Sequence, residues 1–134
     1  MVLSDRAEEI LETLWGELVE QKKEKCDVSI LKDDESLKEL VNSGYVEIKD
    51  SEVSLTAKGK EEAKNCVRRH RLAERLLADV IVVKGKLVHE TSCKFEHLLH
   101  KGIDDNICTL LGHPKTCPHG RPIPEGNCCK DVRR

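Results

Sequence analysis

The segment Tyr45-Val-Glu-Ile-Lys-Asp-Ser-Glu-Val-Ser-Leu55 alternates apolar and polar residues on both sides of Asp50-Ser51. An alternation with a period of two is typical of a strand that buries one face, and two short polar residues between two such runs are typical of a tight turn. The segment therefore predicts a two-stranded hairpin. All other regular structure that we expect in the chain is helical.

Three helices are expected before this hairpin. Apolar residues at the three-four spacing of a one-sided helix predict a helix over residues 4–22; they are Ile10, Leu11, Leu14, Trp15, Leu18 and Val19. Shorter helices are expected over 27–31 and 34–42, and Gly44 ends the second one. A helix, two short helices and a hairpin, in this order, predict a shortened winged helix-turn-helix with a two-stranded wing.

Further helices and then an irregular tail are expected after the hairpin. Helical periodicity returns over 56–79, and two more helices are expected over 86–99 and 102–111. All four prolines lie between Pro114 and Pro124, and proline interrupts regular structure because it lacks an amide hydrogen. The expected fold is mainly α, with three parts: a winged-helix-like domain at 1–57, a helical domain at 58–112 and a Cys/Pro-rich tail at 113–134.

The composition is that of a small soluble protein. The chain has 134 residues, of which 38% are hydrophobic and 36% charged, and its formal net charge is −2. It holds no apolar run near the ~18 residues of a membrane span and no N-terminal leader, so the cytoplasm is the expected location. With one Trp, one Tyr and one Phe, the chain lacks the aromatic residues on which single-stranded nucleic acids stack.

The cysteines and histidines are concentrated in the second half of the chain. All six His residues and six of the seven Cys residues lie there, and Cys26 is the exception. Because an intracellular chain keeps its thiols reduced, and because seven is an odd number, a role as ligands is favoured over disulfides.

One pair of possible ligands lies on the long helix predicted over 56–79. His70 and Glu74 are four residues apart and share the face of the apolar residues Ala63, Val67, Leu77 and Ile81. A buried carboxylate needs a partner, and a metal ion suits both side chains. The alternative is an exposed ion pair on the polar side of the helix.

The next helix carries four more possible ligands. His89, Cys93, Glu96 and His97 are spaced by four, three and one residues, which places them on one side of a helix. Together the two helices offer nitrogen, oxygen and sulfur donors. This mixture suits ferrous iron, manganese, cobalt, nickel or zinc, and it does not suit calcium or magnesium.

Two motifs resemble a known family. Arg69-His-Arg-Leu-Ala-Glu-Arg-Leu-Leu77 and Val88-His-Glu-Thr-Ser-Cys-Lys-Phe-Glu-His97 are similar to the metal-binding and dimerisation domain of the diphtheria toxin repressor and iron-dependent regulator family. The resemblance extends over 56–126, whereas the N-terminal part resembles the family's winged helix in the order of its elements. It implies a Cys-rich member that is shortened and lacks the C-terminal SH3-like domain.

The resemblance also implies two metal sites. His70, Glu74 and His89 would form an ancillary site, and a second, activating site would contain Cys93, Glu96 and His97. A side chain of the first helix would complete the activating site; its position matches Glu9, with Glu12 one turn further on.

What the resemblance implies about function is regulation without catalysis. Metal binding would set the spacing of a homodimer on two half-sites of double-stranded DNA, and no second motif indicates an enzyme. Iron is expected rather than manganese, because Cys93 supplies a thiolate where the manganese type has a carboxylate. No residue of the chain is assigned to DNA contacts.

The charge distribution departs from that of an ordinary operator-binding protein. Residues 27–44 contain five acidic and two basic residues, a net charge of −3, whereas residues 57–76 carry +4. Acidic residues repel the phosphates from which DNA binding draws its affinity. We expect the acidic residues to lie at the start of a helix on a solvated face, where they complement the helix dipole, and most of the basic residues to be solvated as well.

The tail offers a separate set of thiols. Cys108, Cys117, Cys128 and Cys129, with His113 and His119 in reserve, could hold an iron-sulfur cluster or a zinc ion, and Cys93 could be diverted to them. The chain has no CxxC pair, and we expect strain if the adjacent residues Cys128 and Cys129 bind one ion. Reduced structural cysteines are the alternative, and Cys66 is expected in the core.

Two functions therefore remain. The first is a metal-responsive transcriptional regulator. The alternative is an iron or iron-sulfur sensor that no longer recognises an operator and acts through its redox state or a protein partner.

Overall fold

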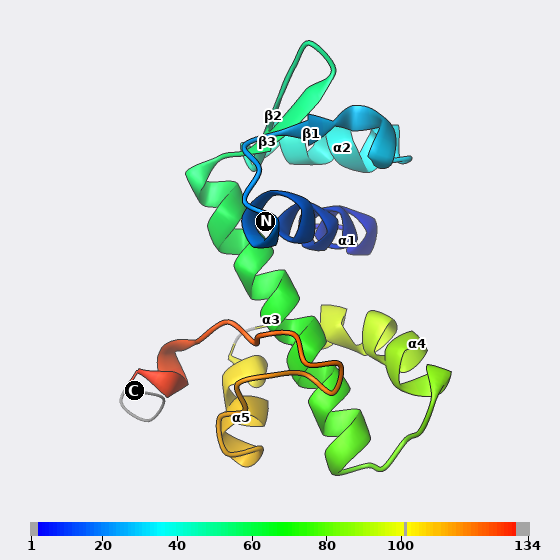
Figure 1. Cartoon of the computed structure of the whole chain (residues 1–134), viewed down its shortest axis with the longest axis vertical. Coiled ribbons are helices and arrows are strands. Elements are labelled where there is room, and N and C mark those ends of the chain that lie inside the picture. Colours follow the sequence, from blue (N-terminus) through cyan, green and yellow to red (C-terminus); the bar gives the residue numbers. More distant parts are fainter. Residues whose placement is uncertain (1–2, 101, 131–134) are drawn as a thin grey trace. The chain divides into compact units, whose positions relative to one another are not determined.

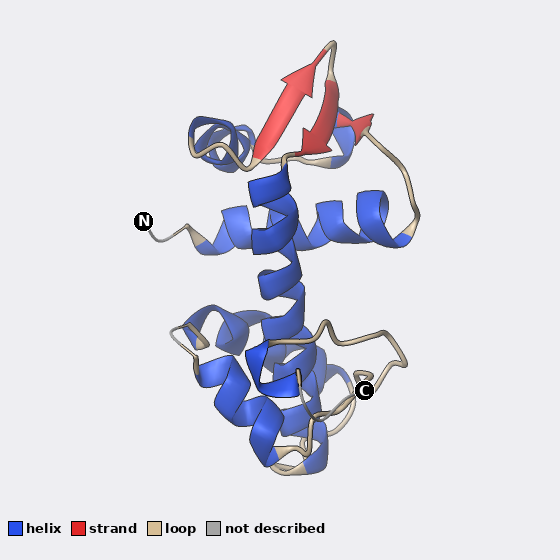
Figure 2. Ribbon diagram, turned by 90° about the vertical axis from the view of Figure 1, so that its left-hand side faces the viewer, coloured by secondary structure: helices blue, strands red, loops and turns tan. Residues whose placement is uncertain are grey.

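The computed structural model describes residues 3–100 and 102–130 (Figure 1). The chain divides into two compact units, Met1–Cys66 and Val67–Arg134, and the division falls within the long helix α3, Ala57–Asp79. Helices form most of both units, and all of the strands belong to unit 1 (Figure 2). No helix among the described residues combines the length and the apolar character that crossing a bilayer requires.

Unit 1 begins with α1, Asp5–Leu14. The hydroxyl of Ser4 accepts a hydrogen bond from the amide of Ala7 at 3.2 Å and so caps the helix. The winding widens after Leu14 into a π-helical segment, Trp15–Glu20. The helix expected over 4–22 is therefore present, but its last third has a different hydrogen-bonding pattern.

The second helix of unit 1 is α2, Asp34–Asn42, and the carboxylate of Asp33 caps it by accepting a hydrogen bond from the amide of Ser36. The short helix expected over 27–31 is present only as a 3-10 helix of three residues. Cys26–Asp27 forms a short strand, β1, and Val28–Ile30 forms a single 3-10 turn. The Asp27 carboxylate accepts a hydrogen bond from the amide of Ser29 at 2.8 Å and so caps the 3-10 turn.

The predicted hairpin is confirmed. Strands β2, Val46–Lys49, and β3, Glu52–Leu55, pair antiparallel with Val46 opposite Leu55. Both turn residues, Asp50 and Ser51, have positive φ, as the tight turns of hairpins require. Strand β1 joins the outer side of β3, so the sheet has three strands in the order β1-β3-β2.

The core of unit 1 lies among α1, α2, the sheet and the start of α3. Its most buried side chains include Leu11, Leu14, Leu40 and Val53. Gly59 of α3 lies against the backbone carbonyl of Tyr45, and a Cβ atom at this position would overlap that oxygen. The close approach of α3 to the hairpin therefore depends on a residue without a side chain.

Unit 2 contains the rest of α3 and two further helices. These are α4, Lys86–Phe95, which continues as a 3-10 turn, Glu96–Leu98, and α5, Ile103–Leu110. The tail then runs along α3 and α5 to a last 3-10 turn, Asn127–Cys129 (Figure 1). Its core joins all of these elements through Leu72, Ala73, Leu99, Ile107, Cys108, Cys117, Ile123 and Cys129.

Three arginines of α3 hold the tail through its backbone carbonyls, and we call this set the arginine clasp. The contacts are Arg68 Nη1 to Pro124 O (3.1 Å), Arg71 Nη1 to Pro122 O (2.6 Å) and Arg75 Nε to Thr116 O (2.8 Å). The irregular tail cannot satisfy these carbonyls by regular pairing, and the guanidinium groups supply the donors.

The expectation that most basic residues of this stretch are solvated is therefore wrong for the middle of α3. Arg68, Arg69 and Arg71 are 1%, 6% and 5% exposed. The spacing of Arg68, Arg71 and Arg75 places the clasp on one side of the helix. Much of the positive charge of residues 57–76 thus belongs to arginines that are buried in unit 2.

We predict opposite effects for two glycine substitutions in unit 1. Gly59→Ala should lower the free energy of unfolding by about 1–3 kcal/mol, because the new methyl group overlaps the carbonyl of Tyr45. Gly16→Ala is the matched control, since no atom lies within 4 Å of a Cβ there. It should leave stability unchanged or raise it by up to about 1 kcal/mol. Urea unfolding measures both, and equal effects would contradict the close approach.

Candidate metal centre

His70 lies at the centre of the predicted metal site, between two carboxylates. Its Nε2 atom is 3.1 Å from Glu74 Oε1, one helical turn further along α3, and its Nδ1 atom is 2.8 Å from Glu96 Oε1. Glu96 belongs to the 3-10 turn after α4. The two helices therefore bring these three side chains together, and both carboxylates are almost completely buried.

Charge decides the protonation of these groups. Burial disfavours a charged imidazole, but the hydrogen bonds and charges of Glu74 and Glu96 outweigh burial and raise the pKa of His70 to about 9. Burial likewise acts to raise the pKa of Glu74, but His70, with His119 and His89 nearby, holds that pKa below its usual value. In the metal-free protein at neutral pH, an imidazolium thus bridges two carboxylates.

Two further histidines approach the other oxygen of Glu74. The Nδ1 atom of His119 lies 3.1 Å from Glu74 Oε2, and the Nδ1 atom of His89 lies 3.8 Å from it. Neither contact has the geometry of a hydrogen bond, so Oε2 is buried without one. His119 was expected among the tail thiols. Its position in an irregular loop has no periodicity that could have assigned it to Glu74.

A thiol stands beside the imidazoles. Cys93 Sγ is 3.4 Å from His89 Nε2, and the ring centroids of His70 and His89 are 5.3 Å apart. One donor atom from each of these three residues lies within 4.8 Å of the others. The structure thus places Cys93 in this group and not with the tail cysteines.

The remaining predicted ligands of this site occupy other places. His97 lies in the same turn as Glu96 and is half-buried. Glu9 and Glu12 lie on α1 of unit 1, where Glu9 is exposed and Glu12 is half-buried. Their participation in an activating site stays a prediction. α4 ends at Phe95 and not near residue 99, so the spacing argument holds for His89 and Cys93 but not for the residues after the α-helix.

The donors that converge in unit 2 fit a divalent transition ion. They are imidazole nitrogens, carboxylate oxygens and the thiols of Cys93 and Cys117, and the buried oxygen Glu74 Oε2 accepts no hydrogen bond. A cation would satisfy that oxygen and would compensate the burial of Glu74 and Glu96. Iron and its neighbours accept such mixed donors, whereas calcium and magnesium require oxygen donors throughout.

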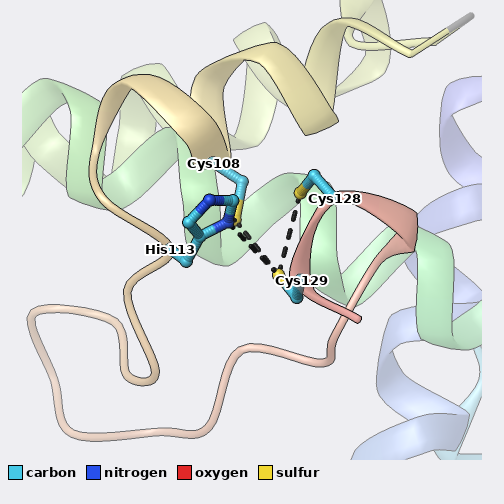
Figure 3. Close-up of side chains that lie close together, drawn as sticks. All are labelled: Cys108, His113, Cys128 and Cys129. Atoms are coloured by element: carbon cyan, nitrogen blue, oxygen red, sulfur yellow. Dashed lines mark hydrogen bonds between the residues drawn. The ribbon is translucent and has the colours of Figure 1, made fainter. Parts of the chain in front are cut away.

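A second group of donors lies at the other side of unit 2. Cys108, at the end of α5, lies with His113, Cys128 and Cys129, and the four side chains point toward one another (Figure 3). The group contains His113 in place of the expected Cys117, which lies near Glu74 and His119. Cys66 is buried in the core of unit 1, as expected.

The thiols of this second group differ in acidity. Burial raises the pKa of Cys128 to about 12, with the neighbouring thiols Cys108 and Cys129 adding to the effect. Burial also acts to raise the pKa of Cys129, but hydrogen bonds with the backbone of Gly126 and with His113 outweigh it and lower that pKa to about 7. The group therefore shares its protons unequally, and Cys129 ionises most easily.

Comparison with known proteins places the second half of the chain among metal-dependent repressors. The family described as "Iron dependent repressor, metal binding and dimerisation domain" matches residues 56–125. The iron-dependent repressor IdeR of Mycobacterium tuberculosis is 41% identical over 75 residues, which are 56% of this chain and 33% of the relative. The diphtheria toxin repressor of Corynebacterium diphtheriae is 35% identical over 75 residues, with the same coverage. The matched region is thus about a third of the length of these relatives.

Solved structures extend the likeness to both units. A manganese-dependent transcriptional repressor in complex with manganese has a TM-score of 0.77 and 29% identity, and the match covers 90% of this chain and 59% of that one. IdeR of T. acidophilum has a TM-score of 0.68 and 27% identity, covering 95% of this chain and 63% of the other. These neighbours support the winged helix-turn-helix expected for unit 1.

We predict that His70 in the metal-free protein titrates with a pKa of about 9. Glu96→Gln should lower this pKa, because the imidazolium loses one of its two charged partners. Glu90→Gln, an exposed change on α4, is the control and should leave the titration of His70 unchanged. NMR titration of the imidazole signals measures all three proteins.

The free energy of unfolding of the metal-free protein should depend on pH through the same residue, His70. The pKa of His70 is higher in the folded protein than its value of about 6.5 in the unfolded chain. The stabilisation from the pairing of His70 is therefore complete below about pH 6.5 and is lost as the pH rises through about 9. An ordinary pKa for His70 in the folded protein would contradict the bridge between Glu74 and Glu96.

Proposed function

Because the chain belongs to the family of iron-dependent repressors, whose metal-binding and dimerisation domain it contains, we propose that it is a transcriptional regulator controlled by a divalent transition metal. The relatives are named as repressors and not as enzymes. The match covers about a third of the length of those relatives. The proposal for the whole chain therefore also needs support from the chain's own site.

The convergence of His70, Glu74, His89, Cys93 and Glu96 in unit 2 carries the proposal. These residues come from the middle of α3 and from α4 with the turn after it, and neighbouring donors are 2.8–3.8 Å apart. Buried carboxylates without a metal role are costly, and here two of them face histidines. The arrangement supports metal sensing more strongly than it supports an ordinary structural ion pair.

Iron is the metal that we propose. The thiol of Cys93 next to His89 adds a sulfur donor to the imidazoles, and thiolates favour softer ions over manganese. Among the neighbours, those with manganese in their titles include a manganese-dependent repressor and the regulator SloR. The chain's own donor set is the reason for our preference.

The contact of the His70 imidazolium with Glu74 and Glu96 couples metal binding to the protonation of His70. The imidazolium of His70 must give up one of its two ring protons to become a ligand, so either Glu74 or Glu96 loses its hydrogen bond while the other nitrogen keeps its proton. Metal binding should therefore release a proton at neutral pH and free one of the two buried carboxylates from the imidazole. Such a rearrangement in the core of unit 2 is a local change that a homodimer could transmit to DNA.

Some of the acidic residues of segment 27–44 have partners inside unit 1, which bears on DNA binding. Glu39 accepts hydrogen bonds from the amide and hydroxyl of Ser4 at 2.9 and 2.7 Å, and Asp33 pairs with Arg6 at 3.2 Å while capping α2. Part of the negative charge is thus compensated by local contacts. We propose that a homodimer binds double-stranded DNA, and the sensor without operator recognition remains the alternative.

A gel-shift experiment with a pool of duplexes tests this function. The metal-loaded chain should bind DNA, and binding should weaken as salt is raised. Glu74→Gln and His70→Ala should each lower the apparent metal affinity by at least about tenfold, because each removes a donor. Glu61→Gln, an exposed change on α3 in unit 1, is the control and should bind like the unmodified chain.

The two candidate functions give different results in this experiment. DNA binding that requires metal supports the regulator. Metal binding at His70 and Glu74 without any salt-sensitive DNA binding, at any metal level, would contradict the regulator and support the sensor.

A further inference from the structure

The group of Cys108, His113, Cys128 and Cys129 is separate from the metal centre at His70. It lies at the junction of α5 with the last turn of the tail, and Cys108 and Cys129 are 0% and 1% exposed. The family match ends at residue 125, so Cys128 and Cys129 lie outside the segment that the family explains. A role for them must therefore be argued from their own geometry.

The donor atoms are spaced like the corners of a single tetrahedral site. With zinc bonds of about 2.3 Å to sulfur and about 2.0–2.1 Å to nitrogen, a tetrahedron separates two sulfurs by about 3.8 Å and a sulfur from a nitrogen by about 3.6 Å. Cys108 Sγ is 3.5 Å from Cys129 Sγ, and Cys128 Sγ is 3.7 Å from Cys129 Sγ. His113 Nδ1 is 3.5 Å from Cys108 Sγ and 3.7 Å from Cys129 Sγ (Figure 3).

The same spacing argues against a cluster. All four donor atoms lie within 4.8 Å of one another. An iron-sulfur core would occupy the middle of the group, and ligands on different irons would have to stand further apart than ligands that share one ion. The 3-10 turn Asn127–Cys129 brings the adjacent cysteines into one group with His113 (Figure 3).

The local backbone brings His113 to the thiols. Gly112 and His113 both have positive φ after the end of α5, which reverses the chain. The amide of His113 then donates a hydrogen bond to the carbonyl of Cys108 at 2.8 Å. Histidine in this left-handed conformation is uncommon, and the short reversal sets the imidazole over Cys108.

The buried guanidinium of Arg68 contacts one of the thiols. Arg68 Nη2 lies 3.3 Å from Cys128 Sγ, and a Cβ atom on Gly126 would stand only 2.5 Å from the same nitrogen. Glycine at 126 therefore lets the guanidinium pass to the cysteine. A positive group that donates to a ligand sulfur favours its thiolate, as the supporting residues of metal sites do.

We propose that Cys108, His113, Cys128 and Cys129 bind one zinc ion in a closed, tetrahedral, structural site. The ion joins the end of α5 to the last turn of the tail. The site has three thiolates and one imidazole and no open position, so it serves stability and not catalysis. It is independent of the centre at His70, and either site can fail without the other.

Cobalt substitution of the full chain tests the site directly. A Cys93→Ser, Cys117→Ser background removes both thiols that lie near the other centre. Cobalt should then bind with the visible bands of tetrahedral coordination and a thiolate-to-metal charge-transfer band of three sulfurs. Cys129→Ser should lose the tetrahedral spectrum, and His113→Cys should keep it with the charge-transfer intensity raised by about a third. Cys26→Ser, in unit 1, is the control and should leave both features unchanged.

Measurements on the unmodified chain keep the proposal testable if a variant fails to fold. Protein purified without oxygen should release one zinc ion per chain when its thiols are blocked, as a colorimetric chelator records. X-ray absorption at the zinc edge should show three sulfurs at about 2.3 Å and one nitrogen. Iron with inorganic sulfide, a disulfide within the group, or the absence of any zinc that thiol blocking releases would each overturn the proposal.

Discussion

The burial of charge on α3 is the constraint on which unit 2 depends. Arg68, His70, Arg71 and Glu74 all lie in the buried or half-buried middle of this one helix. An ion removed from water costs several kcal/mol unless it is paired. Each of these groups therefore requires a specific partner, and α4, α5 and the tail supply those partners.

The two faces of the helix meet this requirement in different ways. On one side, His70 joins Glu74 to Glu96, and a metal ion would compete with the imidazole proton for the same carboxylates. On the other side, Arg68 contacts Asp104, Asp105 and Cys128, and the clasp binds carbonyls of the tail. On the His70 face, the imidazole proton can be exchanged for a metal ion. On the Arg68 face, the cation is a guanidinium, which keeps its charge. This difference separates a site suited to sensing from a site suited to holding structure.

Sequence patterns predicted the parts of the fold that repeat. The hairpin and the extent of α3 followed from period-two and three-four spacing, and His70, Glu74, His89 and Cys93 are close because helices fix such spacings. Patterns could not reveal β1, which has two residues, or the positions of His113 and His119. Those residues lie in irregular backbone, where the partners are chosen by tertiary contacts and not by periodicity. The burial of Arg68 and Arg71 was missed for the same reason, because both donate to carbonyls of a tail without a pattern.

The arginine clasp also determines which signals would report on the order of the tail. Pro122 and Pro124 accept from guanidinium groups and have no amide proton of their own, so hydrogen–deuterium exchange along the backbone is blind to both contacts. Cys117, Gly120 and Ile123 would still show protection, since their amides donate to tail carbonyls. Detachment of the last part of the tail would therefore be recorded by the side-chain resonances of arginine on α3, while the amide map of the tail stayed almost the same.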